Sequence, residues 1–288
     1  MVCVSKETGL LGDDLNKCKF GGKWVYNWGF TLVKILFIGD IVGQPGRKTV
    51  KSVLPEIITK EMIDLVIANG ENSAGGFGLT VDVCQELLNA GIDVITLGNH
   101  TWDNREIYKI LENEPRVVRP ANYPGDTPGY GVYLATTGRN HVIGVINILG
   151  QVFLGPLACP FQIADDYVDR IKDKTKIIII DFHAEATSEK MALGWYLDGR
   201  VTAVIGTHTH ITTADERILP KGTGYITDVG MTGPVNSVLG IDSQLVIKKF
   251  VTKRPVKFEV ASGPSQLNGV ILEVTDSGLT ASIKRIQY

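Results

Sequence analysis

From Val33 onward, short apolar runs alternate with stretches whose apolar residues recur at helical spacing. The spacing of Val50, Val53, Leu54, Ile57 and Ile58 predicts a helix, which Pro55 should kink or split. The other early elements are the strands Val33–Ile38, Leu65–Ala68 and Val94–Leu97 and the helices Val81–Ala90 and Arg105–Glu112. This alternation predicts βαβ units around a buried, largely parallel sheet.

The alternation of strands and helices stops after residue 130, where two predicted strands follow each other with no helix between them. These are Gly131–Leu134 and His141–Leu149. The pattern then predicts strands at Ile177–Asp181, Val201–Ile205 and Tyr225–Asp228, a helix near Ser188–Tyr196, and a tail of strands and turns at Val256–Ala261, Gly269–Val274 and Leu279–Ile286. No low-complexity linker or charge block divides residues 33–288. We therefore expect one α/β domain with a two-sheet core.

Residues 1–32 follow no sustained period, and we interpret them as an N-terminal extension outside the domain. They lack the basic start, apolar stretch and small-residue cleavage site of a secretory signal. The alternating aromatic residues of Lys23–Phe30 leave a second interpretation open, an edge strand.

Composition narrows the class of protein. The 288 residues are 44% hydrophobic and 21% charged, which is typical of a folded globular protein. With 29 basic and 31 acidic side chains, the net charge of −2 offers no broad surface for nucleic acid or an anionic membrane. No apolar run approaches the ~20 residues that span a bilayer. The cysteines show no CxxC spacing and favour a reducing compartment, so we expect a cytoplasmic protein; they are Cys3, Cys18, Cys84 and Cys159.

Polar residues that bind metals or phosphate follow five of the predicted strands, at the edge where open α/β sheets bind ligands. They are Asp40, Glu71-Asn72, Asn99-His100, Asp181-Phe182-His183 and His208-Thr209-His210. Four of the five histidines of the chain fall in these segments, whereas His141 opens a strand. A single histidine at a strand end is more often structural, but five coincident strand ends favour a site.

The number of these side chains predicts two metal ions. One ion takes about four to six ligands, fewer than the chain supplies. The candidate ligands are Asp40, Glu71, Asn72, Asn99, His183, His208 and His210. Two ions ~3.5–4 Å apart that share a carboxylate would use them all, bind a hydroxide between them and attract phosphate oxygens. His100 is left over to protonate the leaving oxygen. The alternative is an α/β domain whose loop histidines are only structural.

Other catalytic motifs are missing from the sequence. Gly39–Gly46 does not match GxGxxG, no P-loop lysine follows it, and no GxSxG is present. Gly75–Gly78 is compatible with a phosphate cradle or with an ordinary loop.

The chain resembles the YmdB-like branch of the calcineurin-type metallophosphoesterases from about Val33 to its C-terminus. The segments that carry the resemblance are Asp40, Gly70-Glu71-Asn72, Gly98-Asn99-His100-Thr101-Trp102-Asp103, Asp181–Lys190, Gly206-Thr207-His208-Thr209-His210 and Thr213–Pro234. Two features depart from the wider superfamily but are shared with this branch. Ile41-Val42 replaces the histidine of the usual D-x-H pair, and Glu71 replaces a bridging aspartate.

The resemblance implies a metallophosphoesterase fold, in which a two-sheet β-sandwich core is flanked by helices in α/β/β/α layers. It also implies two divalent or trivalent ions per chain, with iron or manganese favoured and zinc suitable. Asp40, Glu71, Asn72 and His210 would bind the first ion, and Glu71, Asn99, His183 and His208 the second. His100 would bind a phosphoryl oxygen and protonate the leaving group.

The activity implied is hydrolysis of small phosphodiesters such as 2′,3′- or 3′,5′-cyclic nucleotides by a hydroxide that bridges the metals. Two alternatives stay open: a phosphomonoesterase or nucleotidase of the same fold, and a regulatory metalloprotein with weak catalysis. We expect a small phosphodiester or nucleotide as substrate, with no stable nucleic-acid partner and no membrane association. A homo-oligomer is compatible with the family.

Overall fold

The computed structural model describes residues 3–4, 15–20, 23–28 and 32–288, and the chain divides into two units, Met1–Leu32 and Val33–Tyr288. In the first unit, three strands pair antiparallel in the order β1-β2-β3: β1 Cys3–Val4, β2 Leu15–Phe20 and β3 Lys23–Trp28. β3 lies at an edge of this sheet, so the edge-strand interpretation is confirmed for Lys23–Trp28. Phe30, which it included, lies outside the described residues.

Two six-stranded sheets form the second unit. The first has the order β18-β17-β4-β6-β7-β8. Its strands are β4 Val33–Ile38, β6 Leu65–Asn69, β7 Val94–Thr96, β8 Val117–Val118, β17 Asn268–Val274 and β18 Thr280–Gln287. β4, β6, β7 and β8 run parallel, while β17 and β18 are antiparallel additions at one edge.

The second sheet has the order β13-β14-β12-β11-β10-β9. Its strands are β9 Val132–Thr136, β10 Val142–Leu149, β11 Ile177–His183, β12 Ala203–Thr207, β13 Arg217–Ile218 and β14 Gly224–Ile226. Its centre is parallel, and only the edge strands β9 and β13 are antiparallel. A small sheet beside the first contains β5 Asp40–Ile41, β15 Met231–Pro234 and β16 Ser265–Gln266.

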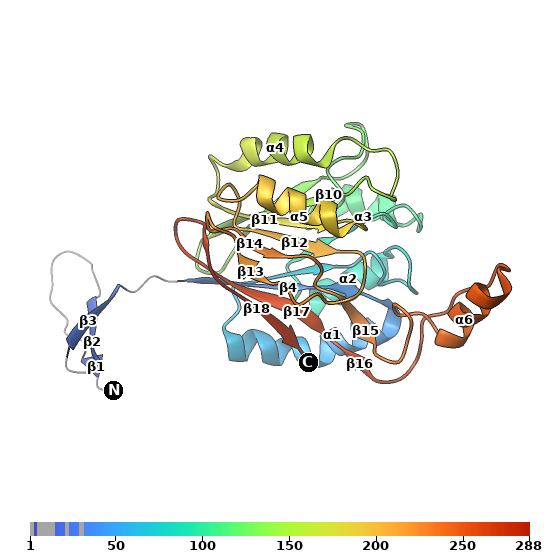
Figure 1. Cartoon of the computed structure of the whole chain (residues 1–288), viewed down its shortest axis with the longest axis horizontal. Helices are drawn as coiled ribbons and strands as arrows, with labels where there is room; N and C mark the ends of the chain where they lie inside the picture. Colours follow the sequence, from blue (N-terminus) through green and yellow to red (C-terminus); the bar gives the residue numbers. More distant parts are fainter. Residues whose placement is uncertain (1–2, 5–14, 21–22, 29–31) are drawn as a thin grey trace. The chain divides into compact units, whose positions relative to one another are not determined.

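Successive side chains along each strand point to opposite faces of the sheet, so each sheet packs against the other sheet on one face and against helices on the other. Val33, Ile35 and Phe37 of β4 pack between the two sheets, whereas Leu36 and Ile38 pack against helices on the outer face. The helices on that face are α1 Gly43–Glu61, α2 Val81–Asn89 and α3 Ile107–Asn113, and α4 Pro160–Ile171 and α5 Thr187–Tyr196 cover the second sheet (Figure 1). The predicted α/β/β/α arrangement is confirmed. A sixth helix, α6 Ser243–Thr252, projects from the body and buries only Val246.

Two sequence predictions about elements need correction. α1 runs unbroken through Pro55, so the helix is not split. Pro55 lies on the exposed face, where water can satisfy the carbonyl group that lacks its partner. Val256–Ala261 forms no strand, because its pairing is limited to one isolated bridge between Val260 and Ile241. α4 was not predicted, although Pro160 at its start is a typical helix-initiation signal.

Among the described residues, no helix combines the length and the apolar character that crossing a bilayer requires.

Candidate active site

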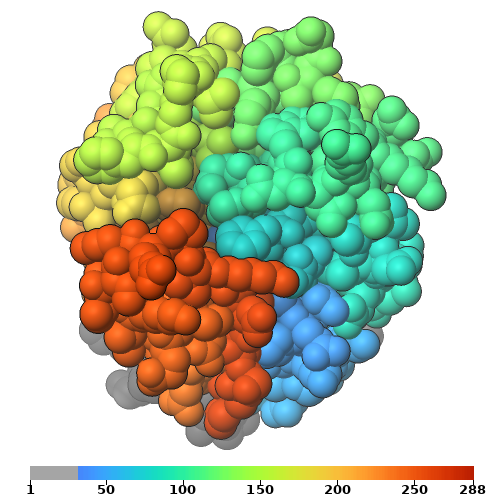
Figure 2. Space-filling model, turned by 90° about the vertical axis from the view of Figure 1, so that its right-hand side faces the viewer, coloured from blue at the N-terminus to red at the C-terminus, as the bar shows by residue number. Residues whose placement is uncertain are grey.

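The predicted site residues all lie at or just after the carboxyl ends of parallel strands. Figure 2 views the molecule from the side on which the cyan segment that follows β6 lies next to the orange segment that precedes β16. The first sheet supplies Asp40 after β4, Glu71 and Asn72 after β6, and Asn99 and His100 after β7. The second sheet supplies His183 at the end of β11, and His208 and His210 after β12. The contacts below show that the structure brings these eight residues together.

Donor atoms from three residues converge on one ring nitrogen of a fourth. His183 Nε2 lies 3.0 Å from Glu71 Oε1, 3.0 Å from Asn99 Oδ1 and 3.0 Å from His208 Nδ1. One imidazole nitrogen carries at most one hydrogen, so it cannot satisfy all three neighbours by hydrogen bonding. Oxygen and imidazole donors that approach this closely are arranged as metal ligands are, and the donor atoms of Glu71, His183 and His208 all lie within 4.8 Å of one another.

A second group of donors surrounds an oxygen that lacks a partner. Asp40 Oδ1 is buried and accepts no hydrogen bond from the described residues. It lies 3.8 Å from His183 Nδ1 and 3.9 Å from His210 Nε2, and His210 Nε2 lies 3.2 Å from Asn72 Oδ1. A buried carboxylate oxygen without a partner is costly, and a cation would satisfy it. The donor set therefore fits a metal ion here as well.

The Asn72 side chain is oriented for this purpose by the loop that follows it. Its Nδ2 donates to Gly76 O at 3.1 Å, which leaves Oδ1 to face His210. The Gly75–Gly78 segment thus orders a candidate ligand, a role that the sequence did not indicate.

Just after β7, the backbone of Gly98 passes close to the side chains of Glu71 and His183. A Cβ atom at Gly98 would lie 2.3 Å from Glu71 Oε2 and 2.4 Å from His183 Nε2. Only glycine leaves room for both donors. On the opposite side of the site, His208 and His210 adopt positive φ values of 99° and 65°, which non-glycine residues rarely do.

The pKa values of Asp40, Glu71 and His183 show how charge is distributed within this cluster. Burial raises the pKa of Asp40 to about 6, although His210 and His183 act to lower it. Burial also acts to raise the pKa of Glu71, but His183 and His100 outweigh it and lower the value to about 2. Burial opposes a charge on His183, yet Glu71 and Asp40 raise its pKa to about 9. The site therefore retains a positive charge among its carboxylates.

His100 lies beside the ligand cluster and is tied to it. Its backbone N–H donates to Glu71 Oε2 at 3.0 Å, and its Nδ1 lies 2.8 Å from Asp103 Oδ2. The ring of Phe77 meets the imidazole edge-on with centroids 5.1 Å apart. Asp103 belongs to the motif quoted above, but the sequence did not predict its contact with His100. With Nδ1 paired to a carboxylate, Nε2 is the nitrogen available to a substrate.

A buried ion pair fixes the turn that carries two of the histidines. Lys190 Nζ donates to Asp228 Oδ2 at 2.7 Å, and both side chains are almost fully buried. The same carboxylate oxygen accepts from the backbone N–H of Thr209 at 3.0 Å and from its Oγ1 at 2.8 Å. Thr209 lies between His208 and His210, so the pair orders both. The sequence did not predict this role for either residue.

Two further side chains orient the imidazole rings of His208 and His183. Glu185 Oε2 lies 3.0 Å from His208 Nε2, and Thr207 Oγ1 lies 2.9 Å from His183 Nδ1 while donating to Asp181 Oδ1 at 2.6 Å. Such partners fix ring orientation in metal sites.

Two packed sheets with oxygen and imidazole donors meeting at one rim define the metallophosphoesterases, which hydrolyse phosphoric esters. The profile of the YmdB-like protein family matches residues 36–286, and the chain belongs to this family. It is 52% identical over 256 residues to the 2′,3′-cyclic-nucleotide 2′-phosphodiesterase of Bacillus subtilis (strain 168), with 88% of this chain and 96% of that protein covered.

Two crystal structures share the fold. A novel phosphatase from Mycoplasma pneumoniae matches with a TM-score of 0.84 and 36% identity, covering 90% of this chain and 94% of that one. A hypothetical protein from Thermus thermophilus matches with a TM-score of 0.84 and 43% identity, covering 89% of this chain and 99% of that one. The expected fold and family are thereby confirmed.

Proposed function

We propose that the 33–288 unit is a single metallophosphoesterase domain, and that it hydrolyses the 2′,3′-cyclic phosphate of a ribonucleotide with two bound metal ions. The observation that carries this proposal is the convergence of Glu71, Asn99 and His208 on His183 Nε2. The name of the Bacillus subtilis relative supports the choice of substrate and of the bond to O2′.

Asp40, Glu71, Asn72 and His210 would bind one ion, and Glu71, Asn99, His183 and His208 the other, with Glu71 shared. Carboxylate, amide and imidazole donors without a thiolate suit iron, manganese or zinc, and the family resemblance favours iron or manganese. When bound, two such ions stabilise charge on phosphoryl oxygens and make water more acidic.

His100 is the group that protonates the leaving oxygen. Water adds to phosphorus and loses a proton, the bond between phosphorus and O2′ breaks, and His100 Nε2 gives its proton to O2′, leaving a nucleoside 3′-phosphate. The proton that the water loses to the solvent replaces the one given by His100. Asp103 accepts from Nδ1 and holds the imidazole in one orientation. The hydrogen bond between the His100 amide and Glu71 keeps this donor beside the ligand cluster.

A substrate panel with the metal-reconstituted protein tests the proposal. Adenosine 2′,3′-cyclic phosphate, adenosine 3′,5′-cyclic phosphate and p-nitrophenyl phosphate are assayed after reconstitution with manganese or iron, and products are separated by chromatography. We expect the 2′,3′-cyclic substrate to have the highest kcat/KM and to yield the 3′-phosphate. Hydrolysis of the monoester alone would instead establish the phosphomonoesterase alternative.

Replacing His100 isolates its role. We expect His100→Ala to retain its metals but to lose about 10²- to 10⁴-fold in kcat on the cyclic nucleotide, the usual contribution of general acid catalysis. Bis(p-nitrophenyl) phosphate, whose leaving group needs no proton, should lose far less. His141→Ala changes a histidine outside the site and serves as the control. Equal losses on both substrates would contradict the role of His100 as proton donor.

A further inference from the structure

A partly exposed phenylalanine lies at the edge of the candidate active site. Phe77 belongs to the Gly75–Gly78 segment, and its side chain is 42% exposed. Its ring meets the imidazole of His100 with centroids 5.1 Å apart and an angle of 68° between the two planes. Among the described residues, Phe77 stacks against no ring besides His100, so part of its ring is open to a ligand.

Hydrogen bonds join the loop that carries Phe77 to a candidate metal ligand. Gly76 O accepts from Asn72 Nδ2 at 3.1 Å, and Gly76 N donates to Asn72 O at 3.1 Å. Ala74 N donates to Gly78 O at 3.1 Å, which closes the loop around Phe77. The position of Phe77 is therefore set by the same residue, Asn72, that we propose as a metal ligand.

The other end of this loop contacts the segment that contains His100. A Cβ atom at Gly78 would lie 3.0 Å from Asn104 Cβ and 3.1 Å from Asn104 N, so the two segments touch closely. Gly78 has a φ of 72°, a conformation that glycine adopts without steric cost. Backbone contacts thus hold Phe77 next to His100, and a substrate that reaches His100 also meets the Phe77 ring.

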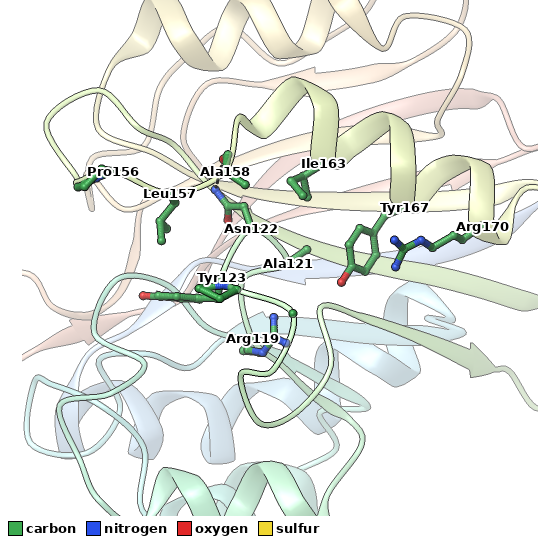
Figure 3. Close-up of a pocket in the computed structure, with 12 residues that line it drawn as sticks. Arg119, Ala121, Asn122, Tyr123, Pro156, Leu157, Ala158, Ile163, Tyr167 and Arg170 are labelled. Atoms are coloured by element: carbon green, nitrogen blue, oxygen red, sulfur yellow. Dashed lines mark hydrogen bonds between the residues drawn. The ribbon is translucent and has the colours of Figure 1, made fainter.

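The other aromatic side chains of this region are less suited to bind a ligand at the site. The Trp102 ring packs against the rings of Tyr108 and Tyr123, each with centroids 5.5 Å apart. Tyr123 also lines a cavity of about 460 Å³ beside α4, and Figure 3 shows its hydroxyl turned away from Tyr167 of that helix. Phe77 is the aromatic ring beside His100 that these contacts leave free.

The structure of the proposed substrate places its base beside His100. In a nucleoside 2′,3′-cyclic phosphate the leaving oxygen O2′ and the base are attached to adjacent carbon atoms of the ribose. The base projects from the opposite face of the ribose to the cyclic phosphate. When the phosphorus lies at the metals and His100 Nε2 reaches O2′, the base therefore extends out of the ligand cluster and passes next to the imidazole.

We propose that Phe77 stacks against the base of the substrate and makes the enzyme selective for nucleotides over other small cyclic phosphodiesters. This inference rests on the proposed function. Because every base has a π-face, stacking selects for the presence of a nucleobase without selecting which one is bound. Phe77 is then a specificity-determining residue, whereas the metals and His100 act on the phosphate.

Two substrates with the same reacting group test the proposal with the metal-reconstituted protein. Adenosine 2′,3′-cyclic phosphate carries a base, and methyl β-D-ribofuranoside 2,3-cyclic phosphate carries a methoxy group in its place. We expect kcat/KM to be about tenfold higher for the nucleotide, mainly through KM, which is the size of effect that stacking on one aromatic ring provides.

Three variants show whether Phe77 is the source of this ratio. Phe77→Ala should bring the ratio of the two kcat/KM values toward one, and Phe77→Tyr, which keeps the ring face, should retain it. If Phe77 only supports His100, both substrates lose activity by the same factor in Phe77→Ala and the ratio does not move.

Trp195→Ala is the matched control and should keep the wild-type ratio. Trp195 is also an exposed aromatic residue, at 51%, and it lies in the last turn of α5. Helix α5 connects the end of β11 to the start of the parallel strand β12, so Trp195 lies at the edge of the sheet opposite to the site.

The outcomes separate this inference from the proposed function. A ratio that falls in Phe77→Ala but persists in Phe77→Tyr and Trp195→Ala supports it. A ratio of one in the wild-type protein, the wild-type ratio in Phe77→Ala, or the same fall in Phe77→Tyr or Trp195→Ala overturns it and leaves the proposed function intact. If neither cyclic phosphate is hydrolysed, the proposed function fails. Calorimetry with adenosine 3′-phosphate and methyl β-D-ribofuranoside 3-phosphate then decides the inference, which equal affinities would overturn.

Discussion

The two sheets contribute chemically different halves of the candidate site. For the proposed ions, the first sheet supplies only oxygen donors, and the second supplies only imidazoles. The oxygen donors are Asp40, Glu71, Asn72 and Asn99, and the imidazoles are His183, His208 and His210. Neither sheet carries a complete ligand set for either proposed ion, so the proposed metal site exists only when the sheets are packed face to face. Metal binding should therefore stabilise the packing of the two layers.

The halves also differ in how they are ordered. Asp40 lies in a strand, and Glu71 is hydrogen-bonded to the His100 amide. His208 and His210 lie in a strained turn that depends on the Lys190–Asp228 ion pair. The oxygen half thus depends mainly on regular backbone, whereas the imidazole half depends on a buried ion pair that can be removed by one substitution.

Glu71→Gln should have the largest effect, because Glu71 joins the two halves. It lies 3.0 Å from His183 through Oε1 and accepts from His100 through Oε2. Loss of the charge weakens both metal sites, so we expect kcat to fall by more than the ~10²- to 10⁴-fold expected for His100→Ala. Metal analysis together with kcat measures the effect. Two ions per chain and near-normal turnover in Glu71→Gln would show that the carboxylate does not bridge.

His183→Ala should affect one half more than the other. We expect the metal content to fall from about two ions per chain toward one, because Asp40, Asn72 and His210 remain, and we expect activity to be lost. Metal analysis of purified protein measures this, with His141→Ala as the matched histidine control. Retention of both ions in His183→Ala would exclude His183 as a ligand.

Lys190→Met should have the smallest effect on turnover and a clear effect on stability. It leaves Asp228 buried without its ion pair, which costs about 3–5 kcal/mol, and the loosened turn should weaken metal affinity about 10- to 100-fold. Denaturant unfolding and metal titration measure the two effects.

Two further variants sharpen that experiment. Lys51→Met breaks the ion pair with Glu86, in which the Lys51 side chain is 55% exposed, and should cost at most about 1 kcal/mol. Adding Asp228→Asn to Lys190→Met removes the unpaired charge and should recover part of the stability. Equal effects of Lys190→Met and Lys51→Met on unfolding and metal affinity would contradict the positioning role.

The layers and the location of the site could be predicted from the sequence because both follow from local patterns. Apolar runs define strands, and a polar residue at the end of each parallel strand must lie at the shared rim. The contacts that order the site could not be predicted. Lys190 and Asp228 are 38 residues apart and carry no periodic signal, and Phe77 looks like any loop phenylalanine until its contact with His100 is seen. The prediction that Pro55 might split the helix was wrong, because the tolerance of a proline depends on which helix face meets solvent.

The left-handed backbone at residues 208 and 210 lowers the stability of the fold, whereas the histidine side chains there serve the proposed activity. A non-glycine residue in this conformation costs about 1–2 kcal/mol, which glycine would avoid. Laboratory selection for heat resistance alone should therefore enrich glycine at these two positions and yield sturdier proteins that no longer turn over substrate. Any thermostabilising campaign on this scaffold must exempt that turn from mutagenesis.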